Sequence, residues 1–110
     1  MSALLPSQVL DAAADLIEPE GAWTQRAWAR GKTGRSVEPT GKAATCWCMA
    51  GAVRKVAGGD KAVKLWIAGI WLRSANPGFT WFGPFNDTRT HSEVVTALRK
   101  AADLARSEGQ

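Results

Sequence analysis

The sequence contains few of the residues that build metal centres and disulfide frameworks. It has two cysteines, Cys46 and Cys48, and a single histidine, His91. A structural zinc site takes four ligands, and a disulfide between two residues this close in the chain would be strained. We therefore expect no metal site and no cofactor, and we expect both thiols to be reduced, as is usual in the cytosol.

Long apolar runs and an export signal are lacking as well. The longest apolar stretch, residues 62–72, includes Lys64 and is too short to cross a bilayer. The first residues have no basic segment ahead of an apolar one, so we expect no signal peptide and a cytoplasmic location. A phosphate-binding P-loop is excluded, because neither Gly31-Lys32 nor Gly41-Lys42 follows a glycine at the required spacing.

The composition is that of one soluble globular domain spanning residues 1–110. Apolar residues make up 45% of the chain and charged residues 22%. The net charge of +4 is unevenly distributed. Residues 1–20 hold acids and no base, whereas residues 21–86 hold an excess of lysine and arginine. This separation indicates either packing between copies of the chain, as in a homodimer, or a surface that meets an acidic partner.

Apolar residues at spacings of three and four predict a mainly α fold, of the α+β class. We expect about four helices packed with a small β-ribbon. The expected helices run over residues 6–18, from Ala43 to the glycines at 58 and 59, from a cap at Asp60, and from a cap at Thr90. The third of these is expected to bury Val63, Trp66, Ile67, Ile70 and Trp71.

Two further segments carry their own local signals. Polar and apolar side chains alternate over residues 22–38 around a glycine-bearing turn at 31–34, which predicts the β-ribbon, and an irregular loop is the alternative. Residues 79–85 hold four aromatic side chains and a Gly-Pro pair, which predicts a loop or short strand inserted into the core. Gly51 interrupts the second expected helix at a cost of about 1 kcal/mol, which indicates that another element packs closely there.

The last expected helix has the clearest start. Thr90 and Glu93 have the spacing of a capping box, in which each side chain accepts a hydrogen bond from the backbone of the other. The helical stripes also predict which side chains are buried. The expected core residues are Leu16, Trp47, Val53, Ile67, Trp71, Val94 and Leu98.

A basic, tryptophan-containing ribbon is the first candidate binding site. Its cations surround the glycine-bearing turn, where they could neutralise phosphates while an exposed tryptophan stacks on single-stranded bases. The alternative is that the tryptophans belong to the core and that the cations are only solvated. The candidate residues are Arg26, Trp28, Arg30, Lys32, Arg35 and Lys42.

A second candidate site is polar and consists of Cys48, Asn86, Asp87 and His91. Cys48 lies near an expected helix start, where the helix dipole would lower the pKa of a thiol. His91 and Asp87 would complete a nucleophilic set only if the last helix began beside the second. The simpler interpretation is a small buried Cys48 and an Asn86-Asp87 pair that hydrogen-bonds the neighbouring backbone.

Three short motifs together carry a family resemblance. They are Trp23-Thr24-Gln25, the Trp47-Cys48-Met49-Ala50-Gly51-Ala52 segment, and Asn86-Asp87 ahead of Thr90. In this order they resemble a small uncharacterised domain family scattered through actinobacterial and bacteriophage genomes. The resemblance implies a bacterial or phage-infected cytosol and an accessory or host-directed protein. It implies no activity and no cofactor.

The sequence therefore favours binding over catalysis. We expect a non-enzymatic protein that binds another protein, encoded by a phage and acting on a host component. The first alternative is nucleic-acid binding through the basic ribbon, and the second is a thiol-dependent enzyme that uses Cys48. Nothing in the sequence indicates a membrane partner.

Overall fold

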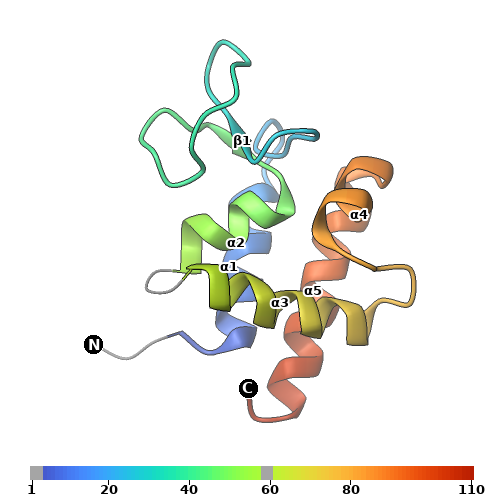
Figure 1. The fold of residues 1–110 in the computed structure, drawn as a ribbon. Helices are drawn as coiled ribbons and strands as arrows, with labels where there is room; N and C mark the ends of the chain where they lie inside the picture. Colours follow the sequence, from blue (N-terminus) through green and yellow to red (C-terminus); the bar gives the residue numbers. More distant parts are fainter. Residues whose placement is uncertain (1–3, 58–60) are drawn as a thin grey trace.

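The chain folds into helices that surround an alanine-rich core, with a small sheet at one end (Figure 1). The computed structural model describes residues 4–57 and 61–110. Within these ranges the fold is mainly α with a small antiparallel ribbon, as predicted. The elements are α1 (Pro6–Ile17), β1 (Ala29–Arg30), β2 (Cys46–Trp47), α2 (Met49–Ala57), α3 (Lys61–Ala75), α4 (Phe82–Thr88) and α5 (His91–Ser107).

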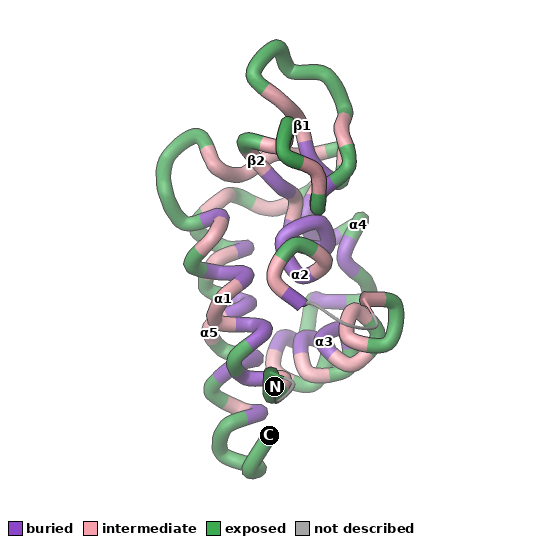
Figure 2. The backbone as a smooth tube through the Cα atoms, turned by 90° about the vertical axis from the view of Figure 1, so that its left-hand side faces the viewer, coloured by how far each residue is buried: buried purple, intermediate pink, exposed green. Residues whose placement is uncertain are grey.

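The two predicted terminal helices are confirmed. They pack against each other through small and branched apolar side chains, and the buried residues gather where the helices face one another (Figure 2). At the start of α5, Thr90 Oγ1 accepts a hydrogen bond from the Glu93 amide, and Glu93 Oε1 accepts one from the Thr90 amide. The Thr90 amide and the Thr90 hydroxyl, through their hydrogen bonds to the Glu93 carboxylate, lower the pKa of Glu93. The capping box therefore begins this helix as the sequence indicates.

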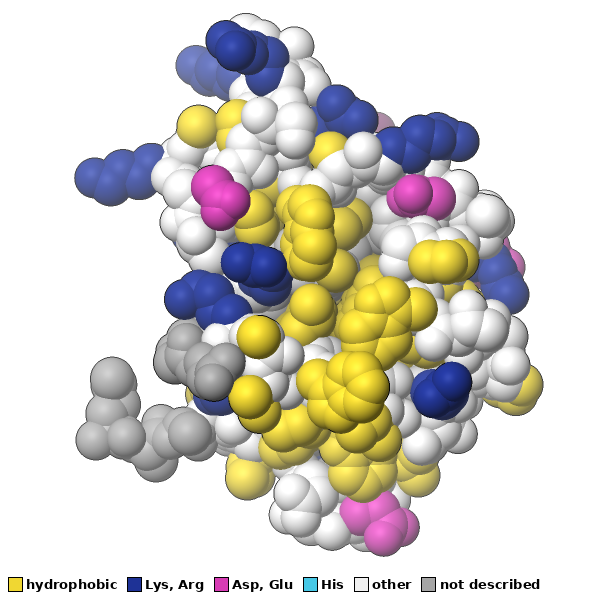
Figure 3. Space-filling model, in the orientation of Figure 1, with side chains coloured by type: hydrophobic (Ala, Val, Ile, Leu, Met, Phe, Trp, Pro, Cys, Tyr) yellow, Lys and Arg dark blue, Asp and Glu magenta, His cyan; other side chains and the backbone are white. Residues whose placement is uncertain are grey.

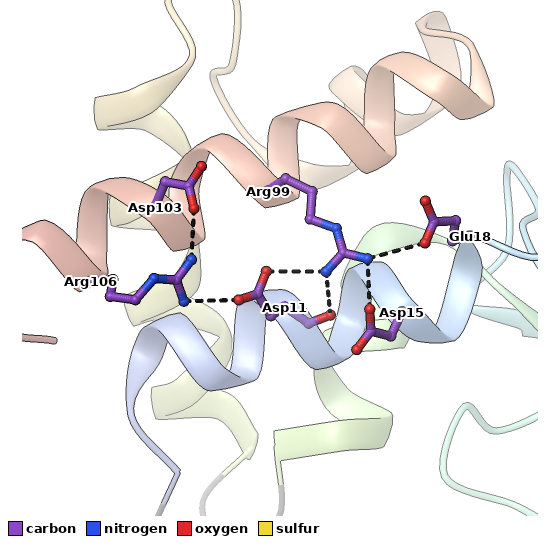
Figure 4. Close-up of polar contacts among 6 residues, drawn as sticks. All are labelled: Asp11, Asp15, Glu18, Arg99, Asp103 and Arg106. Atoms are coloured by element: carbon purple, nitrogen blue, oxygen red, sulfur yellow. Dashed lines mark hydrogen bonds and ion pairs between the residues drawn. The ribbon is translucent and has the colours of Figure 1, made fainter.

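Ion pairs join the outer edges of α1 and α5 (Figure 4). The Arg99 guanidinium contacts Asp11, Asp15 and Glu18 at 3.1, 2.6 and 3.1 Å, and these acids raise its pKa. Arg106 contacts Asp11 at 3.0 Å and also Asp103 on its own helix. Three of the acids in residues 1–20 are thus paired within the chain.

The prediction for the buried side of α3 is wrong. Val63, Trp66 and Ile70 are exposed, whereas the residues that α3 buries are Ala68, Gly69 and Leu72. This helix is apolar on nearly every side, so the spacing of its apolar residues does not select one face. Packing selects the side with the smallest residues, because α3 must approach the other elements closely. A Cβ on Gly69 would lie 2.5 Å from the Trp81 ring.

The other predicted core positions divide into two groups. Trp47, Val53, Val94 and Leu98 are buried, as predicted. Leu16, Ile67 and Trp71 are only half-buried, and Leu16 and Trp71 pack against the edge of the core. These three side chains lie at the borders of their helical stripes, where one part of the side chain faces neighbours and another part faces solvent.

The small sheet pairs different segments from those predicted. Ala29 pairs with Trp47 and Arg30 with Cys46, so the partner of β1 is β2 rather than residues 35–38. The glycine-bearing turn is present, because the Gly34 amide donates to the Gly31 carbonyl and an isolated bridge joins Arg30 and Ser36. Cys46 and Trp47 are consequently strand residues, and α2 begins later than predicted, at Met49.

The aromatic segment is also different from the prediction. It leads into a helix, α4, so the described residues contain five helices rather than four. Pro84 is compatible with this helix because it lies in the first turn, where no intrahelical donor is needed. Phe79, Phe82 and Phe85 are buried, which confirms that the segment inserts into the core. The predicted helix boundary at residues 58–60, including the Asp60 cap, lies outside the described residues.

Among the described residues, no helix is both long and apolar enough to span a bilayer.

Candidate functional site

A buried asparagine joins three parts of the chain at the sheet end of the molecule. Asn86 is 1% exposed. Its Oδ1 accepts hydrogen bonds from Trp23 Nε1 at 2.8 Å and from the Met49 amide at 3.0 Å. Its Nδ2 donates to the Thr24 carbonyl at 3.0 Å. The side chain therefore anchors the segment around residue 24 and also caps the first amide of α2.

Asp87 and Gln25 extend this polar network. Asp87 Oδ1 accepts a hydrogen bond from the Arg26 amide at 2.9 Å, and Gln25 Nε2 donates to the Asn86 carbonyl at 3.0 Å. Arg26 has a φ of 63°, a conformation that residues with a side chain rarely adopt. The Asn86-Asp87 pair thus binds backbone far away in the sequence rather than only its own bend, and it holds a strained turn in place.

A groove opens next to this network. It has a volume of about 470 Å³. Its walls include Trp28, Leu65, Trp81 and Phe82, whereas Arg26, Asn86, Asp87 and Cys48 supply the polar part of its lining. A cavity of this kind, mostly apolar with a few polar groups, is typical of a binding site.

Exposed apolar side chains continue from the groove onto α3. Trp28 is 44% exposed, Trp81 39% and Trp66 62%. The rings of Trp66 and Trp81 lie 5.7 Å apart, so the surface is continuous between α3 and the start of α4. Figure 3 shows this band of apolar side chains across the face of the molecule. We call the surface formed by Trp28, Leu65, Trp66 and Trp81 the Trp groove.

Two glycines allow the walls of the Trp groove to approach the helices. A Cβ on Gly51 of α2 would overlap the carbonyl oxygen of Trp28. A Cβ on Gly69 of α3 would collide with the ring of Trp81. The close approach predicted at Gly51 is therefore present. The backbone of Trp28, whose side chain forms one wall of the groove, makes this approach.

An arginine that has no carboxylate partner in residues 4–57 and 61–110 lies on the same surface. The guanidinium of Arg54, from α2, is 4.9 Å from the centre of the Trp28 ring. Its Nε is buried and makes no hydrogen bond within the described part of the chain. Part of the Arg54 guanidinium is therefore removed from water, and among the described residues the face of the Trp28 indole ring stabilises its charge.

The residues of the predicted basic ribbon separate into different places. Arg26 and Trp28 belong to the groove. Arg30 is held by the chain itself, because its guanidinium donates to Thr24 Oγ1 at 3.1 Å, to the Gly34 carbonyl at 2.9 Å and to the Gln25 carbonyl. The remaining cations surround a second cleft of about 530 Å³, away from Trp28. They are Lys32, Arg35 and Lys42.

Of the predicted thiol set, Cys48 and Asp87 lie in the same groove. Cys48 is half-buried, and this burial raises its pKa despite hydrogen bonds from the backbone at the start of α2. The negative charge of Asp87 raises the pKa further. His91 stacks on Trp23, with ring centres 5.3 Å apart, and its Nε2 contacts the Ile17 carbonyl. The expected lowering of the Cys48 pKa by the helix dipole is therefore outweighed by desolvation.

No metal-binding arrangement of three His, Cys, Asp or Glu side chains occurs in residues 4–57 and 61–110. The polar residues that sequence reasoning missed as site residues are Gln25 and Arg54. Gln25 belongs to the Trp-Thr-Gln motif, which was a signal for it. No sequence motif pointed to Arg54, because its contact with Trp28 arises only in the folded chain.

The fold and the groove define a small, mainly helical domain with an apolar surface site. The chain belongs to a family of unknown function, DUF6197, which it matches over residues 1–104. This family match agrees with the resemblance to an uncharacterised domain family. No curated protein and no solved structure matches the chain significantly.

Proposed function

We propose that this protein acts by binding another protein, without catalysis, and that the Trp groove is the surface that binds. The supporting observation is the exposure of Trp66 next to Trp81 and the apolar groove beside them. Folded monomers seldom leave large apolar side chains clustered in water, and such clusters mark sites of association.

The side chains of the Trp groove are those that contribute most at protein interfaces. Tryptophan and arginine are enriched among interface residues with large energetic effects, and this surface combines three tryptophans with Arg54. Because Gly51 and Gly69 have no side chain, Trp28 and Trp81 pack directly against α2 and α3, so a partner would meet a largely preformed surface. A preformed surface reduces the entropy lost on association.

The cellular setting is part of the same proposal. We infer a bacterial or phage origin, a cytoplasmic location and a host component as the partner. This inference rests on the resemblance carried by Trp23-Thr24-Gln25, the segment that begins at Trp47, and Asn86-Asp87.

Truncation of an exposed tryptophan tests the proposed surface. With a partner isolated by the wild-type protein and then purified, Trp66→Ala is expected to weaken binding at least about tenfold, since such anchors contribute strongly at interfaces. Leu5→Ala, which truncates a comparably exposed residue at the start of α1, should leave the Kd unchanged. The measurement is isothermal titration calorimetry, with circular dichroism to show that both variants are folded. An unchanged Kd for Trp66→Ala would place the interaction elsewhere.

Nucleic-acid binding is the second candidate, and Lys32, Arg35 and Lys42 around one cleft are the observation that favours it. If this function is correct, a single-stranded oligonucleotide will bind with an affinity that falls steeply with salt. Lys32→Glu with Arg35→Glu should then abolish binding and flatten the salt dependence. Arg30 is unsuitable for this test because it stabilises the loop. Equal binding by the wild type and the double variant would exclude this site.

A further inference from the structure

The helices beside the Trp groove, α2 and α3, carry positive charges. Helix α2 contains Arg54 and Lys55, and α3 contains Lys61, Lys64 and Arg73, with no acid in either helix. The carboxylate that lies in the groove is that of Asp87, and its Oδ1 is already bound to the Arg26 amide and to Asn86. Basic side chains therefore outnumber acidic ones beside the apolar centre, which favours a partner with carboxylates.

Arg54 differs from the arginines on the opposite side of the fold. Arg99 and Arg106 each contact two or more carboxylates. Arg54 contacts the Trp28 ring, and its buried Nε has no acceptor among the described residues. The terminal nitrogens of the Arg54 guanidinium are not among the buried atoms and have no carboxylate partner in the described part of the chain, so a carboxylate brought by a ligand would gain a charge-assisted hydrogen bond there.

A symmetric dimer formed through α2 and α3 does not fit the charge on this surface. Two copies that met through α2 and α3 would bring together basic side chains from both, without acids between them. The acidic residues Asp11, Asp15 and Glu18 lie on α1 and its end, where Arg99 already pairs with them, and not on α2 or α3. Like charges placed opposite each other in an interface suppress association.

Neither of the two described strands offers a free edge beside the Trp groove. On β1, the Ala29 carbonyl accepts from the Val37 amide, and on β2 the Trp47 amide and carbonyl bond to Ala22 and Thr24. Both outer edges of the two-stranded ribbon are thus occupied by the chain itself. A partner cannot extend this sheet, so side chains must provide the recognition.

We propose that the partner binds the Trp groove through an amphipathic peptide segment, in which large apolar side chains are flanked by carboxylates. This proposal rests on the proposed function. The apolar anchors pack between Trp28, Leu65 and Trp81. A flanking carboxylate pairs with Arg54, next to the indole of Trp28. The segment is part of a protein, and an acidic nucleic acid is the competing ligand.

Three synthetic peptides with identical Leu and Trp anchors and with Glu, Gln or Lys at the flanking positions test this proposal. Fluorescence anisotropy of the labelled peptides on the full chain should show the Glu peptide binding at least about tenfold more tightly than the Gln peptide, and the Lys peptide most weakly. Arg54→Gln should remove most of the preference for Glu over Gln. Lys100→Glu, an exposed residue of α5, is the control for a change in net charge and should preserve the preference.

The outcomes separate the two proposals. If the Glu, Gln and Lys peptides bind with equal affinity and Trp66→Ala abolishes all three interactions, the proposal of an acidic partner is overturned. The proposal that the Trp groove binds a protein is then supported. Binding that is unaffected by Trp66→Ala, or no binding of any peptide, would overturn both. Displacement of the Glu peptide by a single-stranded oligonucleotide that binds more tightly, with the same dependence on Arg54, would overturn the protein segment as the ligand.

Discussion

Gly51→Ala is expected to destabilise the protein by about 3 kcal/mol or more, even though alanine is the better helix former by about 1 kcal/mol. The added Cβ would overlap the carbonyl oxygen of Trp28 and would lie 2.9 Å from its carbonyl carbon. This carbonyl cannot move freely, because it also accepts a hydrogen bond from the Cys48 amide. Relief of the clash requires separation of α2 from the segment that carries Trp28.

Urea denaturation followed by far-ultraviolet circular dichroism measures this effect. Gly83→Ala is the matched control, since a Cβ at this helical position of α4 meets nothing within 4 Å. We expect this control to be neutral or slightly stabilising. Similar free energies of unfolding for the two variants would contradict the close approach at Gly51.

Asn86→Ala is expected to cost about 3–5 kcal/mol. The truncation leaves Trp23 Nε1, the Met49 amide and the Thr24 carbonyl without their partner in a buried site. Each buried polar group that loses its hydrogen bond costs about 1–3 kcal/mol. The three hydrogen bonds are lost together from one network, so the expected loss of stability is large for a single substitution.

Asn76→Ala is the control for this experiment. Asn76 is also buried, but its side chain donates only to the carbonyls of Leu72 and Ala97. We therefore expect a smaller loss of stability by urea denaturation. If Asn86→Ala is no more destabilising than Asn76→Ala, then Asn86 does not organise the sheet end of the fold. Indole fluorescence of the variant should also change, because Trp23 loses its hydrogen bond.

Local signals predicted the terminal helices well. In α5, the Thr90-Glu93 capping box and the stripe that contains Val94 and Leu98 act within a few residues, and each is sufficient to indicate a helix boundary or a buried face. The close packing at Gly51 was likewise predictable, because a glycine inside a helix is unfavourable unless its missing side chain makes room. The sequence could not identify the approaching element as the backbone of Trp28.

The candidate site was predicted only in pieces. Arg26, Trp28, Cys48, Asn86 and Asp87 were all named from the sequence, but as members of two separate sites. The fold brings these five to one groove and moves Lys32, Arg35 and Lys42 to another cleft. Charge and composition show which side chains are available for binding, whereas their grouping depends on contacts between residues far apart in the chain.

The sequence by itself determined the mainly α class, both terminal helices and the insertion of the aromatic segment into the core, because each follows from the spacing of apolar residues or from a cap. Only the tertiary structure decided the start of α2 and the exposed face of α3. The first depends on Asn86, which caps Met49 from 37 positions away. The second depends on Gly69, since α3 turns its smallest side toward its neighbours and leaves Trp66 in water.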